Sequence, residues 1–251
     1  KECMDIPTFY KILTEIRSVY TPIELNDISF ATYNEPNLDD TFKEKLQIMT
    51  SMGFVYEHIS NGSMITTDLT DFLIENPQNI KQFRLNIPTL DEKKWKDITG
   101  SSVSVLYRMF YQLEYLFSRA SLLNFPITVI VNGDGGEDHK MEFQKVYQKF
   151  SHFKGINLSM TGLIDRAGTL EGAECETQKL PTGAIDWGDQ PLRCNAGYFD
   201  NLYFGIKGNV FYCCHDYHQD YSCGNIHETP LRELLTSENY HKQKQRFMHD
   251  F

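Results

Sequence analysis

The sequence lacks an excess of positive charge, a long hydrophobic run and, over most of its length, cysteine. Its 251 residues include 24 Lys and Arg against 34 Asp and Glu, which gives a formal net charge of −10. This sign disfavours nucleic acid, whose phosphates need clustered cations, so a peptide or a small molecule is the expected partner. Without a membrane-length apolar stretch or a signal-peptide pattern, we expect a cytoplasmic protein that does not bind membranes.

Helical and strand patterns alternate from about residue 5 to residue 165. Amphipathic helices are predicted over residues 4–20, 41–53, 68–77, 104–124 and 140–155, and strands over residues 23–33, 54–62, 80–88, 125–133 and 156–163. In the first helix, Asp5 is placed to cap the first turn, which also contains Pro7. Strands separated by helices of this length indicate parallel βα units, so the predicted class is α/β. Five strands are too few for a closed eight-stranded barrel.

The composition changes after Arg166. Residues 167–191 are rich in glycine, proline and polar residues without a period, and we interpret them as a linker. Residues 192–251 form a second predicted domain, with a hairpin that turns at Lys207-Gly208-Asn209 and a final amphipathic helix over residues 230–250. The predicted domains are therefore residues 1–166 and 192–251, joined by this linker.

The second domain holds four of the six cysteines, Cys194, Cys213, Cys214 and Cys223. Thiolates on tight turns can converge on one metal site, and so dense a cluster disfavours purely structural buried thiols. Four sulfurs, or three with His215, suit zinc as well as an iron–sulfur cluster, and the spacing does not separate the two. His215 and His218, with the nearby acidic residues, are interpreted as a polar rim around this site.

The arrangement of these residues is similar to a known extension. Cys194, the glycine turn at Gly208, Cys213 and the segment GNIHETPLRELLTSENY resemble the SPASM, or shorter twitch, domain of radical S-adenosylmethionine enzymes. The resemblance implies that Cys194, Cys213 and Cys223 hold an auxiliary 4Fe-4S cluster. The fourth ligand would be Cys214, Cys175 or a cysteine beyond Phe251.

The first domain resembles the same superfamily, whose members have a partial (β/α)6 barrel similar to a TIM barrel. Tyr33-Asn34-Glu35-Pro36 stands where the family has a Gly-Gly-Glu-Pro-like turn, and Ser60-Asn61-Gly62 is similar to the family's turn after the next strand. The resemblance implies that Glu35 receives the amino group of S-adenosylmethionine. It also implies polar contacts from Asn34, Ser60 and Asn61, and a ribose contact from Asn86. Taken alone, Asn61-Gly62 is typical of a plain turn.

One family feature is missing. These enzymes bind a catalytic 4Fe-4S cluster through a Cys-x3-Cys-x2-Cys loop, and here Cys3 is the only cysteine before Cys175. We expect the cluster ligands to lie upstream of Lys1, in a longer natural protein whose ends are both trimmed here. The alternative is a degenerate member without radical chemistry, in which zinc or an iron–sulfur cluster stabilises a binding module.

The resemblance implies an enzyme that reductively cleaves S-adenosylmethionine and uses the 5′-deoxyadenosyl radical to abstract hydrogen from a substrate. A ribosomally made peptide is the preferred substrate, and a small molecule such as an aminoglycoside is the alternative. The expected cofactors are S-adenosylmethionine, the catalytic cluster and the auxiliary cluster. An electron donor such as flavodoxin or ferredoxin is the expected partner.

Overall fold

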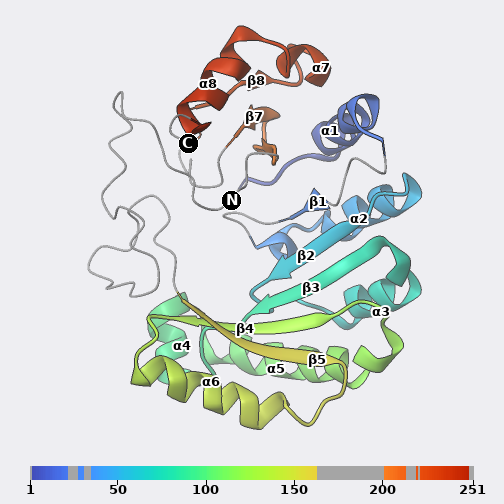
Figure 1. The fold of residues 1–251 in the computed structure, drawn as a ribbon. Coiled ribbons are helices and arrows are strands. Elements are labelled where there is room, and N and C mark those ends of the chain that lie inside the picture. Colours follow the sequence, from blue (N-terminus) through green and yellow to red (C-terminus); the bar gives the residue numbers. More distant parts are fainter. Residues whose placement is uncertain are drawn as a thin grey trace. The chain divides into compact units, whose positions relative to one another are not determined.

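The computed structural model describes residues 2–21, 28–30, 35–162, 201–212, 219 and 221–248, with side chains up to residue 245 (Figure 1). The chain divides into two compact units. Among the described residues, one unit contains residues 28–162, and the other contains residues 2–21 and 201–248. We refer to them as the barrel unit and the C-terminal unit.

The barrel unit is one sheet of five parallel strands in the order β1-β2-β3-β4-β5. The strands are β1 (Ile28–Ser29), β2 (Tyr56–Ser60), β3 (Ile80–Asn86), β4 (Ile127–Gly133) and β5 (Ile156–Gly162). The helices are α2 (Phe42–Ser51), α3 (Thr67–Glu75), α4 (Glu92–Thr99), α5 (Val103–Ser118) and α6 (Glu137–Phe150), with 3-10 turns at Pro36–Leu38, Pro77–Asn79 and Ala120–Leu122. This sequential parallel order confirms the predicted α/β class.

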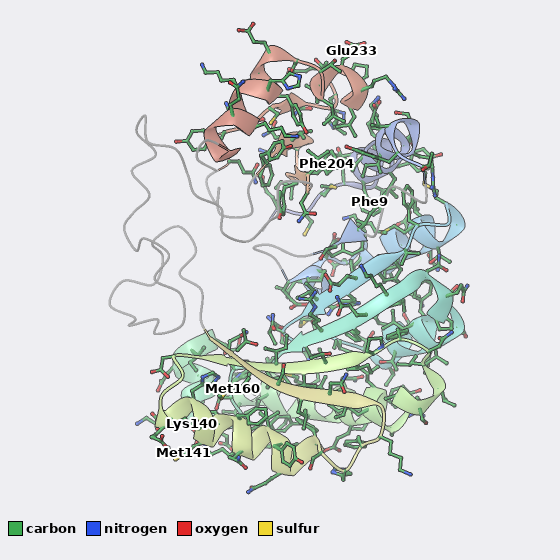
Figure 2. All side chains as sticks on the ribbon, in the orientation of Figure 1. Phe9, Lys140, Met141, Met160, Phe204 and Glu233 are labelled. Carbon is green, nitrogen blue, oxygen red and sulfur yellow. The ribbon has the colours of Figure 1, made fainter. Side chains whose placement is uncertain are left out.

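One face of the sheet forms the core of this unit. Figure 1 shows α4, α5 and α6 along one side of β4 and β5. Alternate strand residues on that face are fully buried, namely Phe83, Leu85, Ile127, Val129 and Val131. Lys140 and Met141 lie on the outer side of α6 (Figure 2), where 52% of Met141 is exposed. The period-2 burial of β3 and β4 therefore places every second side chain on the opposite face of the sheet.

Local signals explain where the helices begin and end. The second helix stops at Ser51, and Gly53 follows with a positive φ of 69°, as expected for a glycine that terminates a helix. Helix α4 was not predicted from the sequence. Asp91 caps it by accepting hydrogen bonds from the backbone N–H groups of Lys93 and Lys94, each at 3.0 Å. The buried side of α4 carries a single buried residue, Trp95.

The C-terminal unit combines helix α1 (Ile6–Val19) with a small three-stranded sheet. The sheet is antiparallel and has the order β6 (Tyr203–Phe204), β7 (Asn209–Phe211), β8 (Gly224–Asn225), and helices α7 (Leu231–Leu234) and α8 (Glu238–Met248) follow it. The predicted hairpin is present, with Gly208 at φ 82° in its turn. The predicted final helix is two helices, because the Ser237 side chain accepts a hydrogen bond from Tyr240 N and caps the second one.

Helix α1 packs against α7, although the sequence predicted it as the first barrel helix. Its predicted cap is present, since Asp5 accepts a hydrogen bond of 2.7 Å from Thr8 N. The buried Glu15 carboxylate accepts a hydrogen bond of 2.8 Å from Leu231 N, and Arg232 donates to Ser18 O at 2.6 Å. The predicted domain boundaries at residues 166 and 191 lie outside the described residues and stay predictions.

None of the helices that the structure describes is long and apolar enough to cross a membrane.

Candidate functional site

The Glu35 carboxylate joins two loops at the carboxyl end of the parallel sheet. It lies just before the 3-10 turn Pro36–Leu38, and its Oε1 accepts hydrogen bonds from Asn37 N at 3.1 Å and from Ser60 Oγ at 2.8 Å. Its Oε2 accepts a hydrogen bond of 2.6 Å from Asn61 N. Three predicted residues, Glu35, Ser60 and Asn61, are therefore in direct contact. Parallel sheets place ligand-binding groups at this edge.

Burial raises the pKa of the Glu35 carboxyl above its ordinary value. The hydrogen bonds from Asn61, Ser60 and Asn37 favour the charged form and oppose this effect. Each carboxylate oxygen has two acceptor positions, so Oε2 retains room for another donor beside Asn61 N–H. The group is therefore suited to accept a hydrogen bond from a ligand that carries an amine.

The turn after β2 is fixed by Ser60 and by a glycine with positive φ. Ser60 Oγ accepts hydrogen bonds from Asn37 Nδ2 at 2.7 Å and from Gly62 N at 2.9 Å. Gly62 has a φ of 78°, and a Cβ added there would lie 3.4 Å from the sulfur of Met109. Asn61 is exposed, and its Oδ1 accepts a hydrogen bond of 2.9 Å from Ser63 N. The Asn61 amide nitrogen has no partner among the residues described.

A buried ion pair fixes the segment that follows Glu35. Lys45 contacts Asp39, and the side chains of the two residues are 4% and 16% exposed. Burial alone would raise the pKa of Asp39, but hydrogen bonds from Lys45 and Thr41 hold it below its ordinary value. The hydrogen bonds of Glu35 and this ion pair thus fix the segment between Glu35 and α2 at both ends. They limit the positions that the Glu35 carboxylate can adopt.

Asn86, the predicted ribose contact, is the last residue of β3. It is half-buried, and its side chain has no partner within the described part of the chain. The loop beyond it is held by Thr89, whose hydroxyl donates to the buried Glu142 carboxylate at 2.6 Å. Asn34 falls outside the described residues, so its predicted role stays a prediction.

Of the predicted cluster ligands, the structure describes Cys223 alone. This thiol is buried, with 2% exposure, and its backbone N–H donates to Val210 O at 2.6 Å. Cys175, Cys194, Cys213 and Cys214 lie outside the described residues. Within those that are described, no group of three His, Cys, Asp or Glu side chains could hold a metal ion. The buried Cys223 thiol beside a tight hairpin has the chemistry of a cluster ligand.

A cavity of about 390 Å³ lies within the C-terminal unit, beside the first turn of α1. It is lined by Glu2, Cys3, Asp5, Thr8, Ile206, Lys207 and His227. Thr8 and His227 share a hydrogen bond of 3.1 Å across it, and Lys207 pairs with Glu2 at 3.4 Å. The hairpin turn and the residues that precede α1 therefore line the same cavity.

Comparison with known proteins finds a similar domain family and similar folds. Residues 194–250 match the SPASM family, an iron–sulfur cluster-binding domain. No curated protein sequence matches the chain. Three similar solved structures are BtrN in complex with AdoMet and 2-DOIA, polyhistidine-tagged anSMEcpe with bound AdoMet, and Streptococcus suis SuiB bound to S-adenosylmethionine.

The likeness to these structures extends over most of the chain. For BtrN the identity is 14%, the TM-score is 0.53, and the alignment covers 96% of this chain and 73% of that one. For anSMEcpe the identity is 15% and the TM-score 0.59, with 96% of this chain and 70% of that one covered. For SuiB the identity is 10% and the TM-score 0.57, with 94% of this chain and 59% of that one covered. The fold is thus that of a partial barrel followed by a small C-terminal domain, as the resemblance of the sequence implied.

Two contributors to the site were not found from the sequence. Asn37 bridges to Ser60, and Lys45 holds Asp39. An Asn directly after Glu-Pro was an available signal for Asn37, because asparagine side chains commonly bond to nearby turns. Lys45 carried no signal, since a lysine on a predicted amphipathic helix is normally exposed.

Proposed function

We propose that this chain is the cofactor-binding barrel and auxiliary-cluster domain of a radical S-adenosylmethionine enzyme that modifies a ribosomally made peptide. The observation that carries the proposal is the position of the Glu35 carboxylate, which contacts Ser60 Oγ and Asn61 N at the carboxyl end of the parallel sheet. The match of residues 194–250 to the SPASM family supports it independently. Three solved structures with the same fold, those of BtrN, anSMEcpe and SuiB, contain bound AdoMet or S-adenosylmethionine.

When bound and reduced, the catalytic cluster would supply the electron that cleaves S-adenosylmethionine to methionine and a 5′-deoxyadenosyl radical. The chain's own residues would hold the cofactor in place. Glu35 accepts hydrogen bonds from the cofactor's amino group through its remaining acceptor positions.

Asn61 and Asn86 provide the other polar contacts. Asn61 is exposed at the turn, and its backbone N–H is held by Glu35, so its side-chain amide is presented from a fixed position. Asn86 ends the neighbouring strand, where its side chain can bond to ribose hydroxyls. A pre-arranged set of donors and acceptors lowers the entropic cost of fixing the cofactor.

In the C-terminal unit, Cys223 would be one thiolate ligand of the auxiliary cluster, together with Cys194 and Cys213. The low exposure of Cys223 keeps water away from this ligand, and burial is one of the factors that set the reduction potential of such a cluster. We assign the fourth position to Cys214, Cys175 or a cysteine beyond Phe251. Flavodoxin or ferredoxin would deliver the electrons.

The peptide substrate is supported by the SPASM match, since this extension is common in peptide-modifying radical enzymes, and by the net charge of −10, which disfavours nucleic acid. A small polar molecule is the second candidate, because the related fold of BtrN is described with 2-DOIA bound. Short peptides encoded beside the gene are the first substrates to add. An increase in 5′-deoxyadenosine with one of them, and none with small polar compounds, would favour the peptide.

The test is a metal and cleavage assay on the full natural gene product, reconstituted without oxygen. We expect about eight or more irons with matching sulfide, as in two 4Fe-4S clusters, and release of 5′-deoxyadenosine after reduction. Cys223→Ser should remove about four irons. Zinc without sulfide would refute the proposal. It would favour the alternative, a binding module that a four-coordinate zinc ion stabilises.

Cofactor placement is tested separately from cluster content. Glu35→Ala should weaken S-adenosylmethionine binding while the iron content stays unchanged. Glu44→Ala is the matched control, because Glu44 is exposed on α2, close in sequence to Glu35. Unchanged cofactor affinity in Glu35→Ala would show that the cofactor does not contact this carboxylate.

A further inference from the structure

Helix α8 contacts both segments of the C-terminal unit that lead into predicted cluster ligands. One segment is the end of β7, where Tyr212 directly precedes Cys213 in the sequence. The other is the turn before β8, where Ser222 precedes the buried Cys223. The helix therefore holds two separate parts of the chain that would supply thiolates to the proposed auxiliary cluster.

The contact with the end of β7 is a hydrogen bond between two tyrosine hydroxyls. Tyr212 Oη and Tyr240 Oη are 2.9 Å apart, and the ring centroids are 5.2 Å apart at an angle of 50°. Tyr212 is buried, with 5% exposure, so its hydroxyl needs a partner within the protein. Tyr240 is in turn fixed at the start of α8, where its N–H donates to Ser237 Oγ at 3.1 Å. The residue before Cys213 is therefore bonded to the first turn of this helix.

The contact with the second segment is a relay of two side-chain amides. Asn239 Nδ2 donates to the backbone carbonyl oxygen of Ser222 at 3.1 Å. Because a carbonyl oxygen can only accept, it fixes which end of the Asn239 amide faces it. Asn239 Oδ1 then faces the buried Gln243, whose Nε2 donates to it at 3.4 Å from the next turn of α8. The relay thus orients Asn239 toward the residue that precedes Cys223.

The backbone around Cys223 has two further contacts. The Cys223 N–H donates to Val210 O on β7 at 2.6 Å. Gly224, the next residue, has a φ of 142°, and a Cβ added there would lie 2.4 Å from Leu234 Cδ2 on α7. Helix α7 therefore packs directly on the backbone that follows Cys223, while α8 bonds to the backbone that precedes it.

Residues behind the ligands commonly orient a metal site, and their loss weakens metal binding or changes the properties of the metal. A ligand that is already held in place also has less conformational freedom to lose when the metal binds. We propose that Asn239 and Tyr240 are positioning residues of the auxiliary cluster, which act through the residues that precede its two cysteines. This inference rests on the proposed function for the identity of the cluster.

The first test measures how fast a chelator removes iron from the reconstituted full-length protein. The signals of the auxiliary cluster are those that disappear in Cys223→Ser. Tyr240→Phe should lose iron from this cluster about 2 to 12 times faster, the range for one lost neutral hydrogen bond. The matched control is Tyr10→Phe, which alters a tyrosine that is 53% exposed on α1 in the same unit and should leave the rate unchanged.

A double-mutant cycle tests whether the two hydroxyls act through one bond. Tyr212→Phe should accelerate iron loss as Tyr240→Phe does, and the double variant should lose iron no faster than either single variant, because the same bond is removed each time. Effects that add in the double variant would overturn the idea that this hydrogen bond positions the ligand. All three variants keep the aromatic rings, so the packing between β7 and α8 is retained.

The reduction potential separates positioning from a general loss of stability. Water that reaches a less firmly held cluster favours its more negatively charged, reduced form. The potential of the auxiliary cluster should therefore rise in Tyr240→Phe, while that of the catalytic cluster stays unchanged. Asn239→Leu, which removes the donor to Ser222 O, should have the same effects through the other segment.

Unchanged iron loss and an unchanged potential in one of these two variants would overturn the assignment of the residue concerned. Equal acceleration of iron loss at both clusters would overturn both assignments, because it would show a general loss of stability. Zinc without sulfide in the unaltered protein would instead reject the proposed function. In that case the rate of zinc release in the same variants still decides whether α8 positions the ligands.

Discussion

Glu35→Gln replaces the bridging carboxylate by an amide of nearly the same shape. The carboxylate accepts hydrogen bonds from Asn37 N, Ser60 Oγ and Asn61 N. The amide has one oxygen, so in either orientation its NH2 group faces one of the two backbone N–H groups. A hydrogen bond to a charged group contributes about 1.5–3 kcal/mol, and the substitution removes one from the Asn37 or the Asn61 amide. We therefore expect the turn after β2 to open about 10 to 150 times more often.

Hydrogen exchange at the backbone amides is the direct assay. In Glu35→Gln, Asn61 or Asn37 should exchange faster by this factor, while amides in the middle of β3 and β4 keep their rates. Glu44→Gln should leave all rates unchanged, because this side chain is exposed on α2. Unaltered exchange at both amides in Glu35→Gln would refute the idea that the carboxylate holds the two loops together.

The same substitution removes a pH dependence. Burial raises the folded-state pKa of Glu35 above the unfolded value of about 4.5, so the folded state binds more protons between these two values. The stability contributed by this group is therefore fully present below about pH 4.5 and falls as the pH rises through the folded pKa. In Glu35→Gln this decline should be absent. A decline of equal size in both proteins would contradict the assignment.

Two further predictions concern residues that stabilise the barrel unit and the C-terminal unit. Gly62→Ala should destabilise the barrel unit by about 1–2 kcal/mol through its positive φ, since the added Cβ would make only van der Waals contact with Met109. Gly53→Ala, which meets no atom within 4 Å, should show a similar loss in urea unfolding. Hydrogen bonds from Lys11 and Leu231 N outweigh burial and lower the pKa of Glu15. Its stabilising effect should be present above about pH 4.5 and lost as the pH falls, and Glu15→Gln should show no such acid loss in thermal unfolding.

The alternating helices and strands of the barrel unit could be predicted because their signals are local. Buried strand residues such as Phe83 and Val129 follow a two-residue period, and Asp5 and Gly53 mark helix ends through backbone chemistry that needs no tertiary partner. Helix α4 was missed because its inner side carries one buried tryptophan, Trp95, which is too little for a detectable hydrophobic period.

The candidate site was predictable where a motif identifies a residue. Glu35, Ser60 and Asn61 could be named from the resemblance of two short turns, and the structure brings all three into contact. The pairing of Arg84 with Glu57 could not be predicted, because it depends on which strands are neighbours and on their register. A charged residue within a strand pattern gives no indication of which charge faces it.

The sequence by itself determined the order of βα units, the glycines of the tight turns and the presence of a cysteine-rich C-terminal domain, since each depends on nearby residues. The tertiary structure decided that α1 packs with α7, that Lys45 is buried against Asp39, and that Asn37 joins Ser60. These contacts connect residues whose separation along the chain carries no periodic signal. They form because folding excludes water from polar groups, which must then find partners in space.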